Sequence, residues 1–216
     1  MGFIAQSFKE GGLMMWPILF ASFLVYGIAI ERIIFLWFRA ATNKEEFVRN
    51  ALKIIYKGNL SAVVDFVSTQ NSPLARIVHA GLLKVRGKDE DVQVAMDEAA
   101  LSELPKIEKR TPYLAMFGNV AMLLGLLGTI SGMIISFAAV ANAEASEKAA
   151  KLALGISEAM NCTAFGLLVA IPALLFYAFL QGKTQAILDD INEGTVRVLN
   201  AILAHRDKLV ASAKDE

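Results

Sequence analysis

Three apolar stretches, each long enough to cross a lipid bilayer, constrain the fold of this chain more than any other feature. They cover residues 13–38, 112–140 and 156–180. A helix needs about 20 predominantly apolar residues to cross the hydrocarbon core, and in that core only helices and closed barrels satisfy every backbone hydrogen bond. The sequence therefore predicts an all-α integral membrane protein with three transmembrane helices.

The composition agrees with a membrane protein and argues against several other classes. Of 216 residues, 56% are hydrophobic, and the formal net charge is zero, unlike that of a protein that neutralises nucleic-acid phosphates. The only cysteine, Cys162, excludes an intrachain disulfide, and His79 and His205 lack the spacing of metal ligands. No nucleophile–base pair is apparent. We therefore expect no enzyme activity, no metal, no cofactor and no nucleic-acid partner.

Lysine and arginine are unevenly distributed among the segments that flank the spans. One precedes the first span, twelve lie between the first and second, two lie between the second and third, and five follow the third. Because segments rich in these residues stay in the cytoplasm, we expect an external segment over residues 1–12, a cytoplasmic loop over 39–111, a periplasmic loop over 141–155 and a cytoplasmic C-terminal helix over 181–216. The first span lacks a basic leader and a cleavage site, so we expect it to be retained.

The large loop has the sequence signals of a helical region. An amphipathic stretch over residues 44–56 is followed by Gly58, and glycine commonly terminates helices. Ser72 and Pro73 are typical of a helix start, with serine as the N-cap and proline in the first turn. A helical period then continues from Asp89 toward the second span. We expect the second and third spans each to extend into the cytoplasmic region as one long helix.

Small residues recur at helical spacing along one face of each of the last two spans. Gly125, Gly128 and Gly132 lie in the second span, and Gly166 lies in the third. The step from Gly128 to Gly132 is a G-x-x-x-G motif, which lets another helix approach closely. Pro172, inside the third span, predicts a kink. Such faces have two interpretations, ordinary helix packing and the wall of an ion path, and the spacing alone favours packing.

Two threonines place hydroxyl groups inside these apolar stretches. Thr129 lies eleven residues from the outer end of the second span, and Thr163 lies seven from the outer end of the third. At about 1.5 Å per residue, both depths are compatible with one level of a shared polar seam. The alternative is that each hydroxyl bonds the carbonyl four residues before it in its own helix.

Glu158 is the only acidic residue in the last two spans, and it lies at the outer end of the third. An ionisable residue at that place is a functional candidate, and the alternative is a side chain that reaches lipid headgroups. No Asp, Glu, His or Lys lies deeper in the last two spans. If protons cross here, the titrating carboxylate must therefore come from another polypeptide.

Two segments resemble the ExbB/TolQ/MotA family of ion-driven motor subunits. The first reads Gly125-Leu-Leu-Gly-Thr-Ile-Ser-Gly-Met133, and the second reads Ile156-Ser-Glu-Ala-Met followed by Thr163-Ala-Phe-Gly and Ala170-Ile-Pro-Ala173. The length and the three spans are closer to the ExbB/TolQ branch than to four-span MotA. The sequence departs from the family pattern at Asn119, Met122 and Asn161-Cys162.

The resemblance implies a homopentamer around a central pore that holds a dimer of an ExbD/TolR-like, single-span partner. The partner's transmembrane Asp carries the ion, H+ or Na+. Thr129 and Thr163 match the family's pore threonines and Glu158 its acidic residue; Ser136 and Asn161 complete our candidate ion path.

We expect a multi-pass stator or channel subunit in the inner membrane of a Gram-negative-type bacterium, coupling ion flow to mechanical work. A non-conducting scaffold that clusters partner helices is the alternative. A self-sufficient transporter is disfavoured because the sequence has neither a central charge nor an inverted repeat.

Overall fold

The computed structural model describes residues 12–40, 44–141 and 143–212, and within these ranges the regular structure is entirely helical. The chain divides into two compact units. The first, which we call the apolar unit, comprises Met1–Arg32 and Arg110–Leu180. The second, the charged unit, comprises Ile33–Lys109 and Gln181–Glu216. Helix α8 contributes residues to both.

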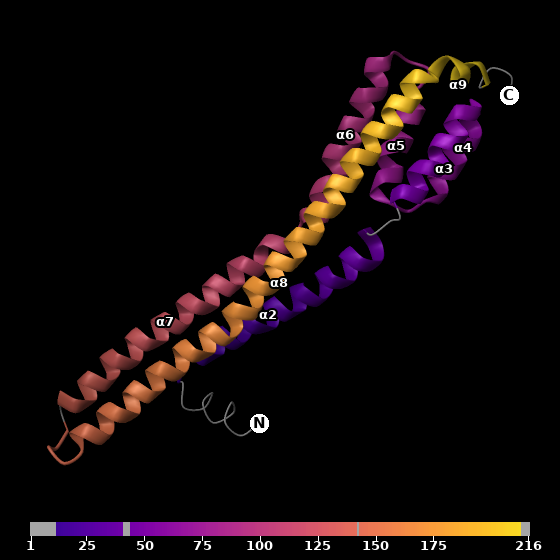
Figure 1. Cartoon of the computed structure of the whole chain (residues 1–216). Helices are drawn as coiled ribbons and strands as arrows, with labels where there is room; N and C mark the ends of the chain where they lie inside the picture. Colours follow the sequence, from indigo (N-terminus) through magenta and orange to yellow (C-terminus); the bar gives the residue numbers. More distant parts are fainter. Residues whose placement is uncertain (1–11, 41–43, 142, 213–216) are drawn as a thin grey trace. The chain divides into compact units, whose positions relative to one another are not determined.

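The apolar unit consists of α2 (Met15–Ile34), α7 (Thr111–Ala141) and the first part of α8 (Lys148–Ala204). Figure 1 shows α7 and α8 running side by side, and the rings of Tyr26 in α2 and Phe176 in α8 form a T-shaped contact. Three helices of the described chain are long and apolar enough to cross a membrane. This finding confirms the predicted number of apolar spans.

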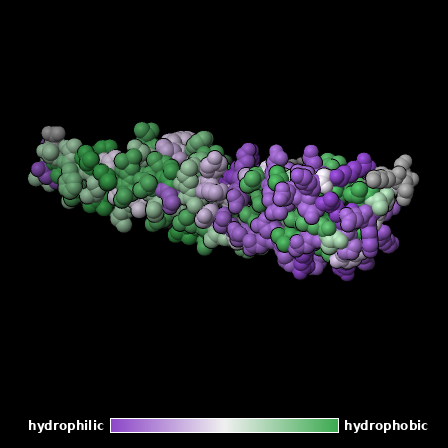
Figure 2. Space-filling view, turned by 90° about the horizontal axis from the view of Figure 1, so that it is seen from above, coloured by the Kyte–Doolittle hydropathy of each residue, from purple (hydrophilic) through white to green (hydrophobic). Residues whose placement is uncertain are grey.

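Large apolar side chains cover the outside of this unit. Phe20, Phe23 and Ile135 are 66%, 70% and 67% exposed, and Figure 2 shows hydrophobic residues over most of the visible surface of the unit. Exposure of this extent is costly in water but matches a surface in contact with lipid. The inward positions combine small side chains such as Ala21 and Ala121 with larger ones such as Ile18 and Leu114.

The charged unit contains four helices of its own before α8. They are α3 (Lys44–Lys57), α4 (Leu60–Thr69), α5 (Pro73–Leu83) and α6 (Asp89–Glu108); α9 (Arg206–Ser212) follows α8, and a π-helix, η1 (Phe35–Ala40), follows α2. The side chain of Ser72 caps α5 and Pro73 is in its first turn, as predicted. Gly58 follows α3 with a φ of 76°, a conformation that glycine adopts without strain. Apolar residues such as Ile55, Ile77, Met96 and Ile202 form the core.

The predicted unbroken helix from residue 89 into the second span is wrong. Helix α6 ends at Glu108 and α7 begins at Thr111, with Lys109 and Arg110 between them. Pro112 explains the position of the break, because proline has no N–H and its ring collides with the carbonyl four residues earlier, here that of Glu108. Pro105 is tolerated inside α6.

The predicted loop over residues 141–155 is too long. Helix α8 already begins at Lys148, where alanine, leucine and lysine favour helix, and Lys151 forms an ion pair with Glu147 at 2.7 Å. The helix then continues without interruption through Pro172 to Ala204. Of the two extended helices that we expected, only this one is continuous.

Candidate functional site

Glycine allows α7 and α8 to approach until their backbones touch. A β-carbon built on Gly166 would lie 2.8 Å from the carbonyl oxygen of Ala121 and 3.1 Å from the Cα of Gly125. A β-carbon on Gly125 would lie 3.0 Å from the carbonyl oxygen of Cys162. These distances are below ordinary contact, so only glycine fits. The small residues of both helices therefore serve packing within the chain.

Thr129 and Thr163 meet at this contact. Their hydroxyl groups are hydrogen-bonded to each other across the two helices. Thr129 Oγ1 also lies 3.2 Å from the carbonyl oxygen of Gly125 and 3.4 Å from that of Ala159, and Thr163 Oγ1 lies 3.2 Å from the same Gly125 oxygen. The two predicted depths thus coincide. The alternative of a bond to the residue's own helix holds for Thr129 as well, since Gly125 is four residues before it.

The hydroxyl pair can respond to a change of charge nearby. Each hydroxyl has one proton and two lone pairs, so one proton fills the bond between the hydroxyls while the other is donated to a carbonyl. Both side chains are partly exposed. A neutral carboxyl group can therefore donate to a free lone pair, and a carboxylate can accept a proton that turns away from a carbonyl. The pair can therefore hydrogen-bond an acid in either protonation state.

Ser136 lies apart from this pair, in the packed face of α7. It is 4% exposed and donates to the carbonyl oxygen of Gly132 at 2.7 Å. A β-carbon on Gly155 of α8 would overlap its hydroxyl. We therefore attribute Ser136 to helix packing.

Glu158 is exposed, one turn of α8 before Cys162, and a β-carbon on Gly12 would overlap its carboxylate. The chain therefore passes close to this carboxylate just before α2, at a glycine with a φ of 70°. Asn161 is partly exposed on the same helix.

The remaining predicted glycines also lie in contacts between helices. A β-carbon on Gly128 would meet the side chain of Cys162 at 2.7 Å, and one on Gly132 would meet that of Ala159 at 3.2 Å. Cys162 itself is 2% exposed. Along α7, and along α8 from residue 159 to residue 180, the sequence contains no carboxylate, lysine, arginine or histidine. The hydroxyl pair thus lies in stretches of the two helices that carry no charged side chain.

The charged unit contains ion pairs that the sequence did not predict. Glu103 of α6 is 7% exposed and contacts Arg76 and Lys106, each at 2.7 Å. Burial, which raises the pKa of Glu103, is outweighed by hydrogen bonds from both cations, so this pKa lies below its ordinary value. Hydrogen bonds to Asp190 and Glu193 raise the pKa of Lys44 to about 12.

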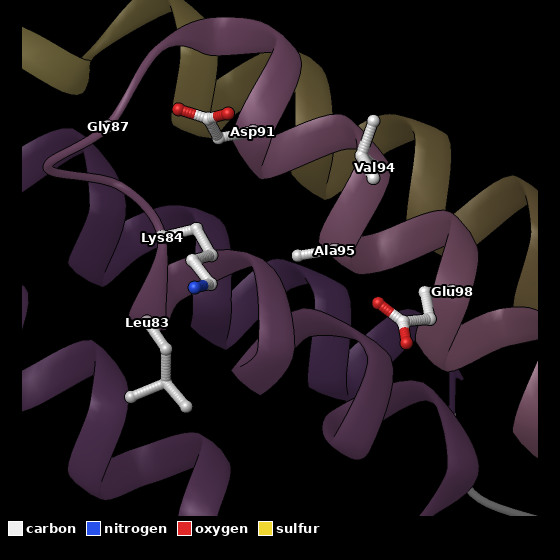
Figure 3. Close-up of a pocket in the computed structure, with 7 residues that line it drawn as sticks. All are labelled: Leu83, Lys84, Gly87, Asp91, Val94, Ala95 and Glu98. Carbon is white, nitrogen blue, oxygen red and sulfur yellow. The ribbon is translucent and has the colours of Figure 1, made fainter.

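A hollow of about 460 Å³ also lies in the charged unit, between the end of α5 and the start of α6. Figure 3 shows its lining, with Asp91 and Glu98 on α6 and Lys84 after α5. The Asp91 carboxylate accepts the backbone N–H of Lys88 at 2.7 Å and so caps α6. Among the described residues no group of three or more His, Cys, Asp or Glu is arranged to hold a metal ion.

Fold and site together define a helical, multi-span membrane protein with a hydroxyl pair in an apolar helix seam. Comparison with known proteins identifies the family to which this chain belongs. Residues 69–193, more than half of the chain, match the MotA/TolQ/ExbB proton channel family. The chain belongs to this family.

Relatives agree with the assignment. The ExbB-like 3 protein of Synechocystis sp. is 31% identical over 167 residues, which cover 77% of this chain and 79% of that protein. The Tol-Pal system protein TolQ of Haemophilus influenzae is 38% identical over 96 residues, 44% of this chain and 42% of that protein. A solved structure of C. jejuni MotAB matches with a TM-score of 0.59 and 18% identity over 96% of this chain and 85% of that one. At this identity the structural match shows the fold.

Proposed function

We propose that this chain is the channel subunit of an ion-driven motor, coupling flow of H+ or Na+ down its gradient to mechanical work on an envelope partner. Membership of the proton channel family supports the general activity. The observation that carries the proposal is the hydrogen-bonded pair Thr129–Thr163 in a seam without any carboxylate. The energy available is sufficient for mechanical work, because one charge crossing 100 mV releases about 2.3 kcal/mol.

In this proposal a second chain supplies the titrating group. Its partner is a single-span, ExbD/TolR-like protein with a transmembrane Asp, present as a dimer inside a pentamer of this chain. Thr129 and Thr163 hydrogen-bond the partner's Asp in both its protonated and ionised forms. Glu158 and Asn161, both accessible on α8, form the outer part of the path. The apolar remainder of the seam limits water leakage.

We also propose that the chain lies in the inner membrane of a Gram-negative-type bacterium with its N-terminus outside and its C-terminus in the cytoplasm. The support is the excess of lysine and arginine in the segments between α2 and α7 and after residue 180. In this orientation the charged unit is cytoplasmic and the segment between α7 and α8 is periplasmic.

The test replaces both threonines with valine, which has a similar volume but no hydroxyl group. The complex with its partner is reconstituted in liposomes, and ion flux is measured under an imposed gradient, with an uncoupler as a reference. We expect flux to fall at least tenfold in T129V/T163V while the complex purifies intact. The matched control is T129S/T163S, which keeps both hydroxyls and should conduct. Unchanged flux in the valine variant would refute the role of the pair.

A non-conducting scaffold is the second candidate. It is favoured by the packing itself, since the glycines and Ser136 are used in contacts between α7 and α8. A scaffold would support its process equally well with and without an uncoupler, and its liposomes would show no flux above the lipid background.

A further inference from the structure

A groove of about 340 Å³ lies on the apolar unit, away from the threonine pair, between α2 and the start of α7. It is lined by Gly27, Ile28 and Glu31 from α2, by Arg110 just before α7 and by Tyr113 in the first turn of α7. A β-carbon on Gly27 would have no neighbour within 4 Å. The missing side chain therefore leaves room beside an apolar helix surface, and no other part of the described chain fills it.

The lining of the groove contains one cation, Arg110, and one carboxylate, Glu31. Arg110 is half-exposed and contacts Glu31 Oε2 at 3.2 Å, while the other carboxylate oxygen, Oε1, lies 3.4 Å from Arg32. Glu31 thus divides its two oxygens between two guanidinium groups. Among the described residues it is the only ion-pair partner of Arg110, and a guanidinium has five donors. Several donors of Arg110 remain for a ligand.

Arg110 also has an unusual backbone. Its φ is 74°, and it is the one non-glycine residue with positive φ in the described chain. This conformation costs an ordinary side chain roughly 1–2 kcal/mol, whereas glycine and asparagine adopt it readily. Strain of this kind collects at ligand sites. A left-handed turn alone would favour glycine or asparagine at this position. The arginine side chain of Arg110 therefore needs a separate explanation.

The groove lies where a transmembrane surface turns polar. Ile30 of α2 is 59% exposed, and Tyr113, which lines the groove together with Arg110, is 50% exposed. Tyrosine is enriched at the level of lipid headgroups. A lining that combines an apolar helix surface with a guanidinium and a phenol matches the polarity of a phospholipid, with its acyl chain and its phosphate.

We propose that this groove binds one anionic phospholipid, with Arg110 and the Tyr113 hydroxyl on the phosphodiester and an acyl chain over Gly27 and Ile28. Charged grooves beside transmembrane helices bind such headgroups. Glu31 is already engaged by two arginines, so it offers little to the ammonium group of a zwitterionic lipid. The site does not depend on ion conduction and stands independently of the proposed function.

The test counts bound lipid by native mass spectrometry on the full chain in detergent. The probes are phosphatidylglycerol, phosphatidylcholine with matched acyl chains, and inorganic phosphate. We expect phosphatidylglycerol to bind at least tenfold more tightly than phosphatidylcholine, and inorganic phosphate not to compete at millimolar concentration. Equal binding of the two lipids would overturn recognition of an anionic headgroup, and competition by inorganic phosphate would overturn a lipid as the ligand.

Two variants connect the binding to the groove. R110N keeps a residue suited to positive φ and removes the cation, and G27L fills the groove. Each should lower the affinity for phosphatidylglycerol roughly tenfold, whereas R49N on α3 and G182L, at a glycine with no neighbour within 4 Å, should not. Without added lipid, R110N should melt no lower than the wild type. Unchanged affinity in both groove variants would refute the site.

Discussion

Glu103 is the only aspartate or glutamate among the buried residues of the described chain. Its carboxylate bridges α5 and α6 through Arg76, and it also holds Lys106 one turn away on its own helix. A buried carboxylate without these cations would be protonated or would destabilise the fold. The two ion pairs therefore allow Glu103 to be buried, and they stabilise the fold only while its carboxylate is ionised.

The pH dependence follows from the direction of this shift. The pKa of Glu103 is lower in the folded chain than its ordinary value of about 4.3. Its contribution to stability is therefore complete above about pH 4.3 and is lost as the pH falls through the folded value. We expect E103Q to lower the unfolding free energy at pH 7 by roughly 1–3 kcal/mol, and the melting temperature with it. The difference in melting temperature between E103Q and the wild type should shrink on acidification.

The measurement is thermal denaturation of the detergent-solubilised chain between pH 3 and pH 8. E98Q is the matched control, because Glu98 is exposed on the same helix, where it lines the hollow in Figure 3. It should change stability by no more than about 0.5 kcal/mol. A gap between E103Q and the wild type that stays constant down to pH 3 would contradict the linkage.

For single residues, a sequence predicts a contact best where helical spacing alone decides it. Thr129 and Thr163 were expected at one level because helical rise converts residue number into depth, and their hydroxyls do meet. Glu103 and Arg110 were not singled out. The burial of Glu103 and the positive φ of Arg110 depend on contacts between segments and on a helix break, which no single-helix pattern encodes.

The close packing of α7 against α8 depends on glycine at the points where the two backbones touch. A methyl group on Gly166 would press on the backbone of α7, at the carbonyl oxygen of Ala121, and backbone cannot rotate away as a side chain can. Alanine normally stabilises a helix by about 0.5–1 kcal/mol relative to glycine. Here overpacking should outweigh that gain, so we expect G166A to destabilise the chain by about 1–2 kcal/mol.

The same helix provides the control for this prediction. Gly182 of α8 has no atom within 4 Å of an added β-carbon, so G182A should gain helix propensity without a clash. Melting temperatures of the two variants in one detergent should move in opposite directions, G166A down and G182A unchanged or up. Equal shifts would mean that the contact with Ala121 is not limiting.

Helix limits show which local signals the sequence expresses clearly. The cap at Ser72 and the glycine after α3 were predicted because each is a short-range signal. The break before α7 was not predicted, although Pro112 marks it. A proline in the first turn of a helix also ends the helix that precedes it. The early start of α8 at Lys148 was missed because hydropathy marks where lipid contact begins and not where a helix begins.

At the scale of the whole molecule, polarity separates the two units. The three apolar spans were predictable from hydropathy alone, because lipid contact requires apolar residues on the outside as well as the inside. The ion pairs of the charged unit, such as that of Lys44 with Asp190 and Glu193, join residues far apart in sequence and were not predictable. The orientation of the chain is predicted by the number of lysines and arginines in each segment that flanks the spans.

The proposed orientation can be tested with single cysteines in a C162A background, which removes the only native thiol, itself 2% exposed. S146C lies in the short connection before α8, and A211C lies in α9; both positions are exposed. With a membrane-impermeant maleimide on intact spheroplasts, we expect S146C to be labelled at once and A211C only after lysis, since lysine- and arginine-rich segments stay in the cytoplasm. Both should react fully in detergent. Labelling of A211C before lysis, with S146C protected, would invert the orientation and place the charged unit outside the cytoplasm.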